Sequence, residues 1–169
     1  MTEPGELRPG PKPDLDLSLV RAELPSPELG RFLYSAVGGD WYWTDRLQWT
    51  FQQWLDRLSS PAVETWVAYV GGTPAGYFEL DLDARGDCEI AYFGLLPAFI
   101  GKGIGSWLLT KAIERGWERG AKRVWVHTCS LDGPSALANY QARGLRVFNE
   151  ETVAQELTER PIGPWPEAR

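Results

Sequence analysis

The alternation of apolar and polar residues predicts the first elements of the chain. Residues 14–20 read DLDLSLV, and a leucine at every second position is typical of a strand with one buried face. In residues 28–37 the apolar side chains recur at helical spacing, and two glycines end the pattern. A second helix is expected over residues 44–58, where Thr44 is suited to cap the N-terminus. The chain should therefore begin with one strand and two helices.

Three strands are expected next. Residues 64–70 and 73–83 each favour a strand, and the glycine pair between them is typical of a hairpin turn. The apolar run of residues 90–96 favours a further strand, which Pro97 ends. Gly94 within this run is consistent either with a bulge or with a gap left for packing. Because the connections are short, the three strands should pair antiparallel in sequence order.

A glycine-rich loop and an amphipathic helix follow this central strand. The loop reads GKGIGS over residues 101–106, and the apolar residues after it recur at helical spacing. The free N–H groups and the dipole of a first helical turn favour an anion, and glycines let a phosphate approach the backbone. The P-loop pattern fails because no Ser or Thr follows Lys102, and the dinucleotide pattern fails because Ser106 replaces its last glycine. The loop therefore predicts a pyrophosphate-bearing ligand without naming it.

The rest of the chain is expected to complete a single domain. Residues 121–128 favour a strand, which a helical crossover should place parallel to the central strand. Residues 135–143 favour a helix, and residues 145–153 a last strand.

Proline-rich segments are expected at both ends. Residues 1–13 should form a flexible leader with little to bury, and residues 154–169 a proline-rich C-terminal tail. The domain itself is then expected to span residues 14–153.

Composition and charge narrow the classes of protein that fit. No apolar run approaches the roughly 20 residues that a membrane span needs, and the formal net charge of −6 argues against a nucleic-acid surface. Cys88 and Cys129 are expected to be buried, reduced thiols, and the first residues carry no secretory signal, which together indicate a cytoplasmic protein. One histidine and no CxxC pair argue against a metal site.

Three local patterns add to the order of elements. IGKGIG at residues 100–105 has glycines at the fourth and sixth positions, LLPAF ends the central strand, and ALANYQARGLRVF places Tyr140 four residues before Gly144. Together with the order strand, two helices, three strands, helix, strand, helix, strand, these patterns resemble the GNAT superfamily of N-acetyltransferases over residues 14–153. The acetyl-CoA signature of that superfamily is Arg/Gln-x-x-Gly-x-Gly/Ala, and Ile100 departs from its first position.

The resemblance implies a fold, a reaction and a co-substrate. The fold would be an α/β (α+β) mixed, mostly antiparallel central sheet, flanked by helices and with a splayed central strand pair. The reaction would transfer an acetyl group from acetyl-CoA to an amine by direct attack. The glycine loop would bind the pyrophosphate through N–H groups, and the pantetheine arm would pair with the exposed edge of the central strand. The acetyl-CoA contacts implied are Phe93, Gly94, Leu95, Leu96, Gly101, Lys102, Gly103, Ile104, Gly105 and Ser106.

Acetyl transfer needs an acid for the departing thiolate and a base for the amine. The resemblance assigns the acid to Tyr140 and the base to Glu89, acting directly or through water. Glu79 is an alternative base, because it alternates with buried residues and should face the acceptor. His127, the one histidine, is expected to be structural, and Asp132 is expected to cap a helix.

The acceptor site is expected among the aromatic residues that link the two first helices. Trp41, Tyr42 and Trp43 cannot all face one core, so they are predicted to line this site together with Glu79. Aromatic faces suit an apolar or cationic acceptor, such as a small-molecule or peptide amine. A longer acyl-CoA as donor, or a non-catalytic CoA-binding or regulatory module, remains an alternative. The nine tryptophans and the proline-rich tail are compatible with a homodimer.

Overall fold

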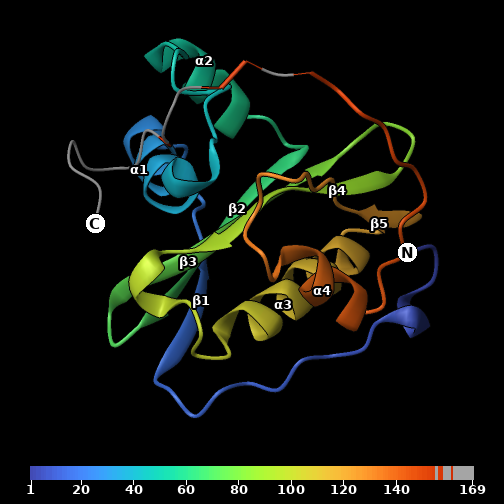
Figure 1. The fold of residues 1–169 in the computed structure, drawn as a ribbon. Coiled ribbons are helices and arrows are strands. Elements are labelled where there is room, and N and C mark those ends of the chain that lie inside the picture. Colours follow the sequence, from blue (N-terminus) through green and yellow to red (C-terminus); the bar gives the residue numbers. More distant parts are fainter. Residues whose placement is uncertain (155, 158–160, 162–169) are drawn as a thin grey trace.

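The computed structural model describes residues 1–154, 156–157 and 161, and it contains a five-stranded sheet with helices on both faces (Figure 1). Each strand lies beside its neighbour in sequence, and all pairs are antiparallel except the last, which is parallel. The mixed, mostly antiparallel sheet expected from the sequence is therefore confirmed. The strands are β1 (Leu17–Arg21), β2 (Val63–Val70), β3 (Thr73–Leu82), β4 (Asp87–Leu95) and β5 (Arg123–Trp125).

The predicted hairpin joins β2 to β3. Gly71 and Gly72 have φ values of 54° and 80°, in the left-handed region that a tight hairpin turn requires and that only glycine adopts without strain. The turn prediction is confirmed.

In the part of the chain that the structure describes, four α-helices cover the two faces of the sheet. On one face, α1 (Pro27–Gly38) packs on Val67 and Tyr77, and α2 (Phe51–Leu58) packs against α1 and β2. On the other face, α3 (Ile104–Glu118) and α4 (Ala136–Ala142) pack on Phe78 and Ile90. Tyr77 and Phe78 are neighbours on β3, so the alternation of side chains along one strand supplies both cores. Among the described residues, no helix is long and apolar enough to cross a bilayer.

The second helix begins later than predicted. α2 starts at Phe51, and its cap is Thr50, whose hydroxyl accepts a hydrogen bond from the Gln53 N–H while the Gln53 side chain accepts one from the Thr50 N–H. This reciprocal capping box defines the helix start. Thr44, predicted as the cap, instead begins a turn in which its carbonyl accepts from the Leu47 N–H. The prediction of Thr44 as the cap was wrong.

The last predicted strand is not formed. Residues 145–153 have no strand conformation, and Val147 and Phe148 are exposed. The outer edge of β5 is already occupied, because Val124 exchanges two backbone hydrogen bonds of 3.0 Å with Met1. A further strand would need this edge.

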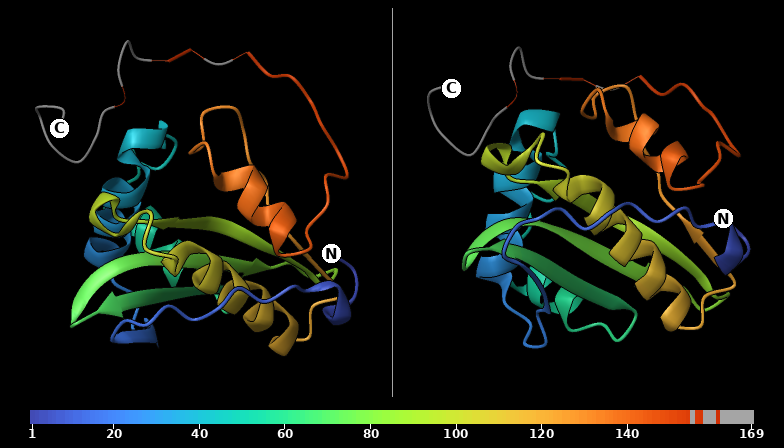
Figure 2. Two further views of the ribbon diagram at one scale, coloured as in Figure 1. Left: turned by 60° about the horizontal axis from the view of Figure 1, so that its bottom comes forward. Right: turned by 90° about the horizontal axis from the view of Figure 1, so that it is seen from below.

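The N-terminal segment differs from the flexible leader expected for residues 1–13. It runs along α3 (Figure 2), where the Gly10 N–H donates to Thr110 Oγ1 at 2.8 Å and the Arg8 N–H donates to the Arg143 carbonyl. Gly10 is buried, and a Cβ atom there would lie 2.8 Å from the Ser106 carbonyl oxygen. The segment therefore buries backbone against the helix, which its proline-rich composition did not reveal. Most of the tail predicted over residues 154–169 lies outside the described residues.

Replacing Thr110 tests this docking. Thr110→Val keeps the side-chain shape but leaves the buried Gly10 N–H without its acceptor, so the free energy of unfolding should fall by about 1–3 kcal/mol. Urea denaturation measures the change, and amide exchange at Gly10 should become faster. Thr110→Ser, which keeps the hydroxyl, is the matched control; equal amide exchange at Gly10 in the two variants would show that the segment is not held by this bond.

Candidate active site

β4 separates from β5 after only three residue pairs, which end at Glu89 and Trp125. On its other side β4 stays paired with β3 as far as Leu95. From Ile90 onward, the second edge of β4 therefore has no strand partner among the described residues. Its N–H and C=O groups can pair with an extended ligand, and Phe93 to Leu96 are only half-buried. This is the splayed strand pair that the family resemblance implied.

A bulge sets which side chains of β4 face the same way. The register passes from Glu79 opposite Tyr92 to Asp81 opposite Glu89, with Ala91 as the extra residue. Since Glu79 and Asp81 lie two apart on β3, Glu89 and Tyr92 share their face, the one covered by α1 and α2.

Position 94 is a glycine because α1 packs closely on it, and not because the strand has a bulge there. A Cβ atom at this position would lie 2.5 Å from Val37 Cγ1 of α1. The interpretation of Gly94 as a gap left for packing is therefore confirmed, and the bulge lies three residues earlier, at Ala91.

The glycine loop forms the start of α3. Gly101 and Gly103 have φ values of 82° and 77°, and Gly103 is the N-cap, with no side-chain bond to the first helical N–H groups. Gly105 and Ser106 lie in the first turn, whose N–H groups have no partner within the helix. This backbone fits a pyrophosphate, because the N–H groups of a first helical turn point to one place and no side chain caps them.

The side chains around the loop differ in what they can add. Ile104 is fully buried and offers a ligand only its backbone. Lys102 is exposed, with its Nζ 5.4 Å from the centre of the Phe99 ring. Ile100, also exposed, has no hydrogen-bonding group to replace the Arg or Gln of the acetyl-CoA signature.

Tyr140 lies on α4 beside the open edge of β4. Its ring is 6.1 Å from that of Phe93, and burial raises the pKa of its hydroxyl above the usual value. The phenol is protonated at neutral pH, as an ordinary tyrosine is, and therefore carries a proton that it can donate. Asn139 Nδ2 donates to the Gly105 carbonyl at 3.4 Å, which joins α4 to the loop. Nothing in the sequence marked Asn139 except its place beside Tyr140.

Glu89 lies at the point where the strands separate, and it has a partner that the sequence did not reveal. His127 Nδ1 is 2.7 Å from Glu89 Oε1. His127 lies two residues beyond Trp125, which is opposite Glu89 in the sheet. This hydrogen bond is the main cause that raises the pKa of His127 above its usual value, and the charges of Asp132 and Asp45 act in the same direction.

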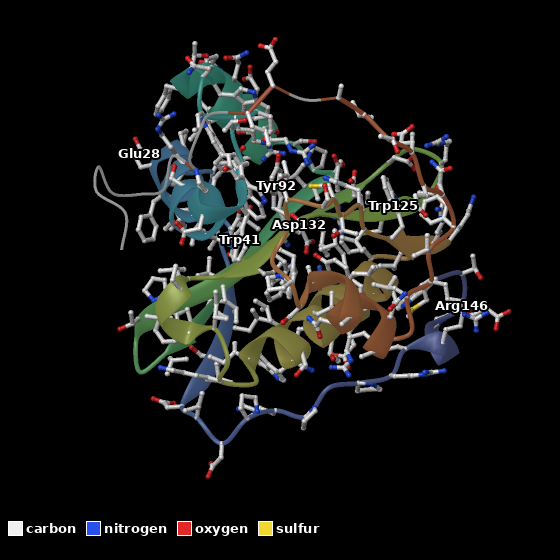
Figure 3. All side chains as sticks on the ribbon, in the orientation of Figure 1. Glu28, Trp41, Tyr92, Trp125, Asp132 and Arg146 are labelled. Carbon is white, nitrogen blue, oxygen red and sulfur yellow. The ribbon has the colours of Figure 1, made fainter. Side chains whose placement is uncertain are left out.

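The three aromatic residues predicted to line the acceptor site lie in different surroundings. Trp41 lies against the loop after β5, since a Cβ atom on Gly133 would be 3.3 Å from its indole (Figure 3). Trp43 packs inward, 4.9 Å from the ring of Tyr92 and directly over Gly38. Tyr42 has a left-handed φ of 58°, a strained conformation for this residue type. Trp43 is thus part of the core packing, and the acceptor contacts of Trp41 and Tyr42 stay predictions.

Two aspartates complete this face of the site. Asp45 accepts hydrogen bonds from the hydroxyls of Tyr34 and Tyr92. Asp132, predicted as a helix cap, instead accepts from the hydroxyl of Thr128 and the N–H of Cys129, and α4 begins without a side-chain cap. The same turn leaves the Cys129 thiol exposed, whereas Cys88 is buried as expected. Figure 3 shows Trp41, Tyr92 and Asp132 in the region between α1 and α4.

Comparison with known proteins identifies the domain. A model described as the acetyltransferase (GNAT) family matches residues 25–145. The chain belongs to the GNAT family. A search of curated proteins gave no match.

Solved GNAT structures share the fold at low sequence identity. An aminoglycoside acetyltransferase, meta-AAC0020, from an uncultured soil metagenomic sample, in complex with trehalose, superposes with a TM-score of 0.66 at 16% identity, covering 86% of this chain and 97% of its own. AAC(6')-Iy in complex with the bisubstrate analog CoA-S-monomethyl-acetylneamine gives 0.63 at 14% identity, covering 84% and 99%. A ribosomal-protein-alanine N-acetyltransferase from Brucella melitensis biovar Abortus 2308 gives 0.62 at 14%, covering 83% and 99%.

Glu79 of this GNAT domain lies in a buried ion cluster rather than in an open acceptor site. Both carboxylate oxygens are bonded: Arg46 Nη1 and Nη2 each donate at 3.0 Å, and Arg57 Nη2 donates at 2.8 Å. The carboxylate is almost fully buried, and Arg57 also pairs with Asp81. The Arg46 guanidinium in turn lies 4.3 Å from the centre of the Tyr92 ring. The expectation that Glu79 faces the acceptor, as a base or as a contact, is therefore wrong.

Removal of this charge should destabilise the domain. Glu79→Gln leaves Arg46 buried without a counter-ion, so the free energy of unfolding should fall by about 3–5 kcal/mol in chemical denaturation. The matched control is Asp83→Asn, which removes the partner of the exposed Arg85 and should cost less than about 1 kcal/mol. Equal losses in the two variants would contradict a structural role for Glu79.

Proposed function

We propose that this chain transfers an acetyl group from acetyl-CoA to a primary amine at the open edge of β4. The observation that carries the proposal is the arrangement around this edge. The glycine loop lies at its end, Tyr140 on the face of α3 and α4, and Glu89 on the face of α1 and α2. A thioester lying along the edge would have a proton donor on one side and a carboxylate on the other.

The binding of acetyl-CoA would rest mainly on backbone groups. The N–H groups from Gly103 to Ser106 would hold the pyrophosphate, and Lys102 would add a positive charge at the rim. The free edge from Phe93 to Leu96 would pair with the amide groups of the pantetheine arm, as an added strand does. Acetyl-CoA supplies the activated acetyl group.

Each polar residue then has one part in the transfer. Tyr140, a phenol that is neutral at physiological pH, would give its proton to the departing sulfur. Glu89 would support removal of a proton from the ammonium group, which is needed because an amine with a pKa near 10 is mostly protonated at neutral pH. Acid and base would act on opposite faces of the same strand edge.

The charge of the acceptor face favours a cationic small molecule. Three carboxylates, those of Asp45, Glu89 and Asp132, lie close enough to His127 to raise its pKa, so this face is acidic. Tyr92 and Trp41 add aromatic surface to it. The aminoglycoside acetyltransferases named above share the fold, which supports an amine with several positive charges as the first class to test. Peptide amines and longer acyl-CoA donors are the comparison classes.

The function is tested by the release of free thiol from acetyl-CoA with neamine, spermidine and a hexapeptide as acceptors. Tyr140→Phe should lower kcat by about 10²-fold or more and leave the Kd for acetyl-CoA unchanged, because the lost hydroxyl acts on the leaving group. Tyr69→Phe, on β2 and away from the edge of β4, is the matched control. Binding of acetyl-CoA with no turnover by any acceptor would favour a non-catalytic CoA-binding module, and faster turnover with a longer acyl-CoA would reassign the donor.

Trp41 and Trp43 should respond differently to replacement. Trp41→Ala removes surface that faces the acceptor, so the KM for the acceptor should rise by roughly 2- to 30-fold with an unchanged Kd for acetyl-CoA. Trp43→Ala removes a packed ring and should lower the free energy of unfolding by about 3–5 kcal/mol. Steady-state kinetics and denaturation separate the two effects. An unchanged acceptor KM in Trp41→Ala would remove this residue from the acceptor site.

A further inference from the structure

The pair formed by Glu89 and His127 has the geometry of an oriented imidazole. His127 Nδ1 lies 2.7 Å from Glu89 Oε1, while two-thirds of the His127 side chain is exposed. When Nδ1 carries the proton and donates it to the carboxylate, the lone pair of the imidazole is on Nε2. Among the described residues, Nε2 has no hydrogen-bond partner, so it is open to a ligand.

The pair also lies at the right place in the sheet. Glu89 is the last residue of β4 that pairs with β5, and the free edge begins directly after it. The imidazole therefore stands at the entrance to this edge, on the face opposite Tyr140. An amine that reaches the edge from the face of α1 and α2 would meet His127 first.

An imidazole suits the deprotonation of an amine better than a carboxylate does. An ordinary glutamate has a pKa near 4.3 and is a far weaker base than imidazole, whose pKa is near 6.5. The groups that face His127 strengthen it further: Glu89 on β4 through the hydrogen bond, Asp132 on the following loop and Asp45 on the connection between α1 and α2. All three are carboxylates, and all raise the pKa of His127. Asp81, opposite Glu89 on β3, is neutralised by Arg57 of α2.

We infer that His127 Nε2 takes the proton from the acceptor ammonium, and that Glu89 is a positioning residue that holds the imidazole in the required tautomer. This inference rests on the proposed acetyl transfer and replaces Glu89 by His127 as the base itself.

The protons balance in the complete step. Nε2 takes one ammonium proton, and the freed nitrogen lone pair forms the N–C bond to the thioester carbonyl carbon as the C–S bond breaks. Tyr140 gives its proton to the sulfur, and the second proton that the nitrogen loses restores the tyrosine. The products are an amide and a free thiol, and the imidazolium releases its proton to water.

The test uses the fact that His127 is the only histidine in the chain. Its proton NMR titration is therefore unambiguous, and its pKa can be compared with the acidic limb of kcat for the best acceptor among neamine, spermidine and the hexapeptide. In the wild type both should lie above 6.5, the ordinary value for histidine. Glu89→Gln should move both to lower pH together, because the bond to Glu89 is the largest cause of the shift.

Replacement of the imidazole separates the two candidates for the base. His127→Gln should lower kcat by about 10²-fold or more and abolish the acidic limb, with an unchanged Kd for acetyl-CoA. Glu114→Gln, on α3, is the control for a carboxylate-to-amide change. It should alter neither the acidic limb nor the plateau of the pH profile of kcat. Turnover that keeps its limb in His127→Gln but is lost in Glu89→Gln would overturn this inference and leave acetyl transfer standing. No thiol release by the wild type would overturn both proposals.

Discussion

The short pairing of β4 with β5 is the constraint on which the site depends. A parallel ladder of three residue pairs holds β5 in the sheet, and the separation that follows leaves backbone donors and acceptors of a central strand unused. In a continuous sheet these groups would be satisfied by a neighbour and closed to a ligand. Gly105, in the first turn of α3, lies against Leu95 at the end of this same strand, so the free edge and the loop proposed to bind the pyrophosphate are neighbours. The side chains proposed to act in catalysis, Tyr140 and Glu89, lie on either side of this edge.

A buried ion cluster fixes the connection between α1 and α2, which borders the candidate site. The connection between α1 and α2 has little regular structure, yet Arg46 within it is fixed by Glu79 of β3 and by the rings of Tyr92 and Trp49. Burying these charges is costly unless every charged atom finds a partner, and here the carboxylate accepts from two guanidinium groups. The cluster thereby sets the place of Asp45, and through Asp45 the place of the Tyr92 hydroxyl. Buried residues thus shape the face on which the acceptor is proposed to bind.

The features that could be predicted from the sequence are those fixed by local chemistry. The hairpin at Gly71 and Gly72 and the loop that opens α3 follow from residue types and their spacing, whereas the place of Tyr140 was implied by the resemblance to the GNAT superfamily. The predictions are wrong where a segment far away in the sequence occupies or buries the residues concerned. The last strand fails because Met1 holds the edge of β5. Glu79 alternates like a residue of an open face, but two arginines from other elements bury it. The bond between Glu89 and His127 joins residues 38 positions apart, so no local pattern marks it.

Gly94 contacts both parts of the candidate site, the free edge of β4 and the helix α1. Its backbone belongs to the edge that would pair with the pantetheine arm, and its Cα lies directly under Val37, near the end of the helix that leads to Trp41. A substrate that stiffens one of these elements would also stiffen the other across this contact. Any coupling of the two binding events through this contact must be reciprocal, with each substrate changing the affinity for the other by the same factor. Gly94, where a side chain would clash with Val37, would then connect the acetyl-CoA site with the acceptor site.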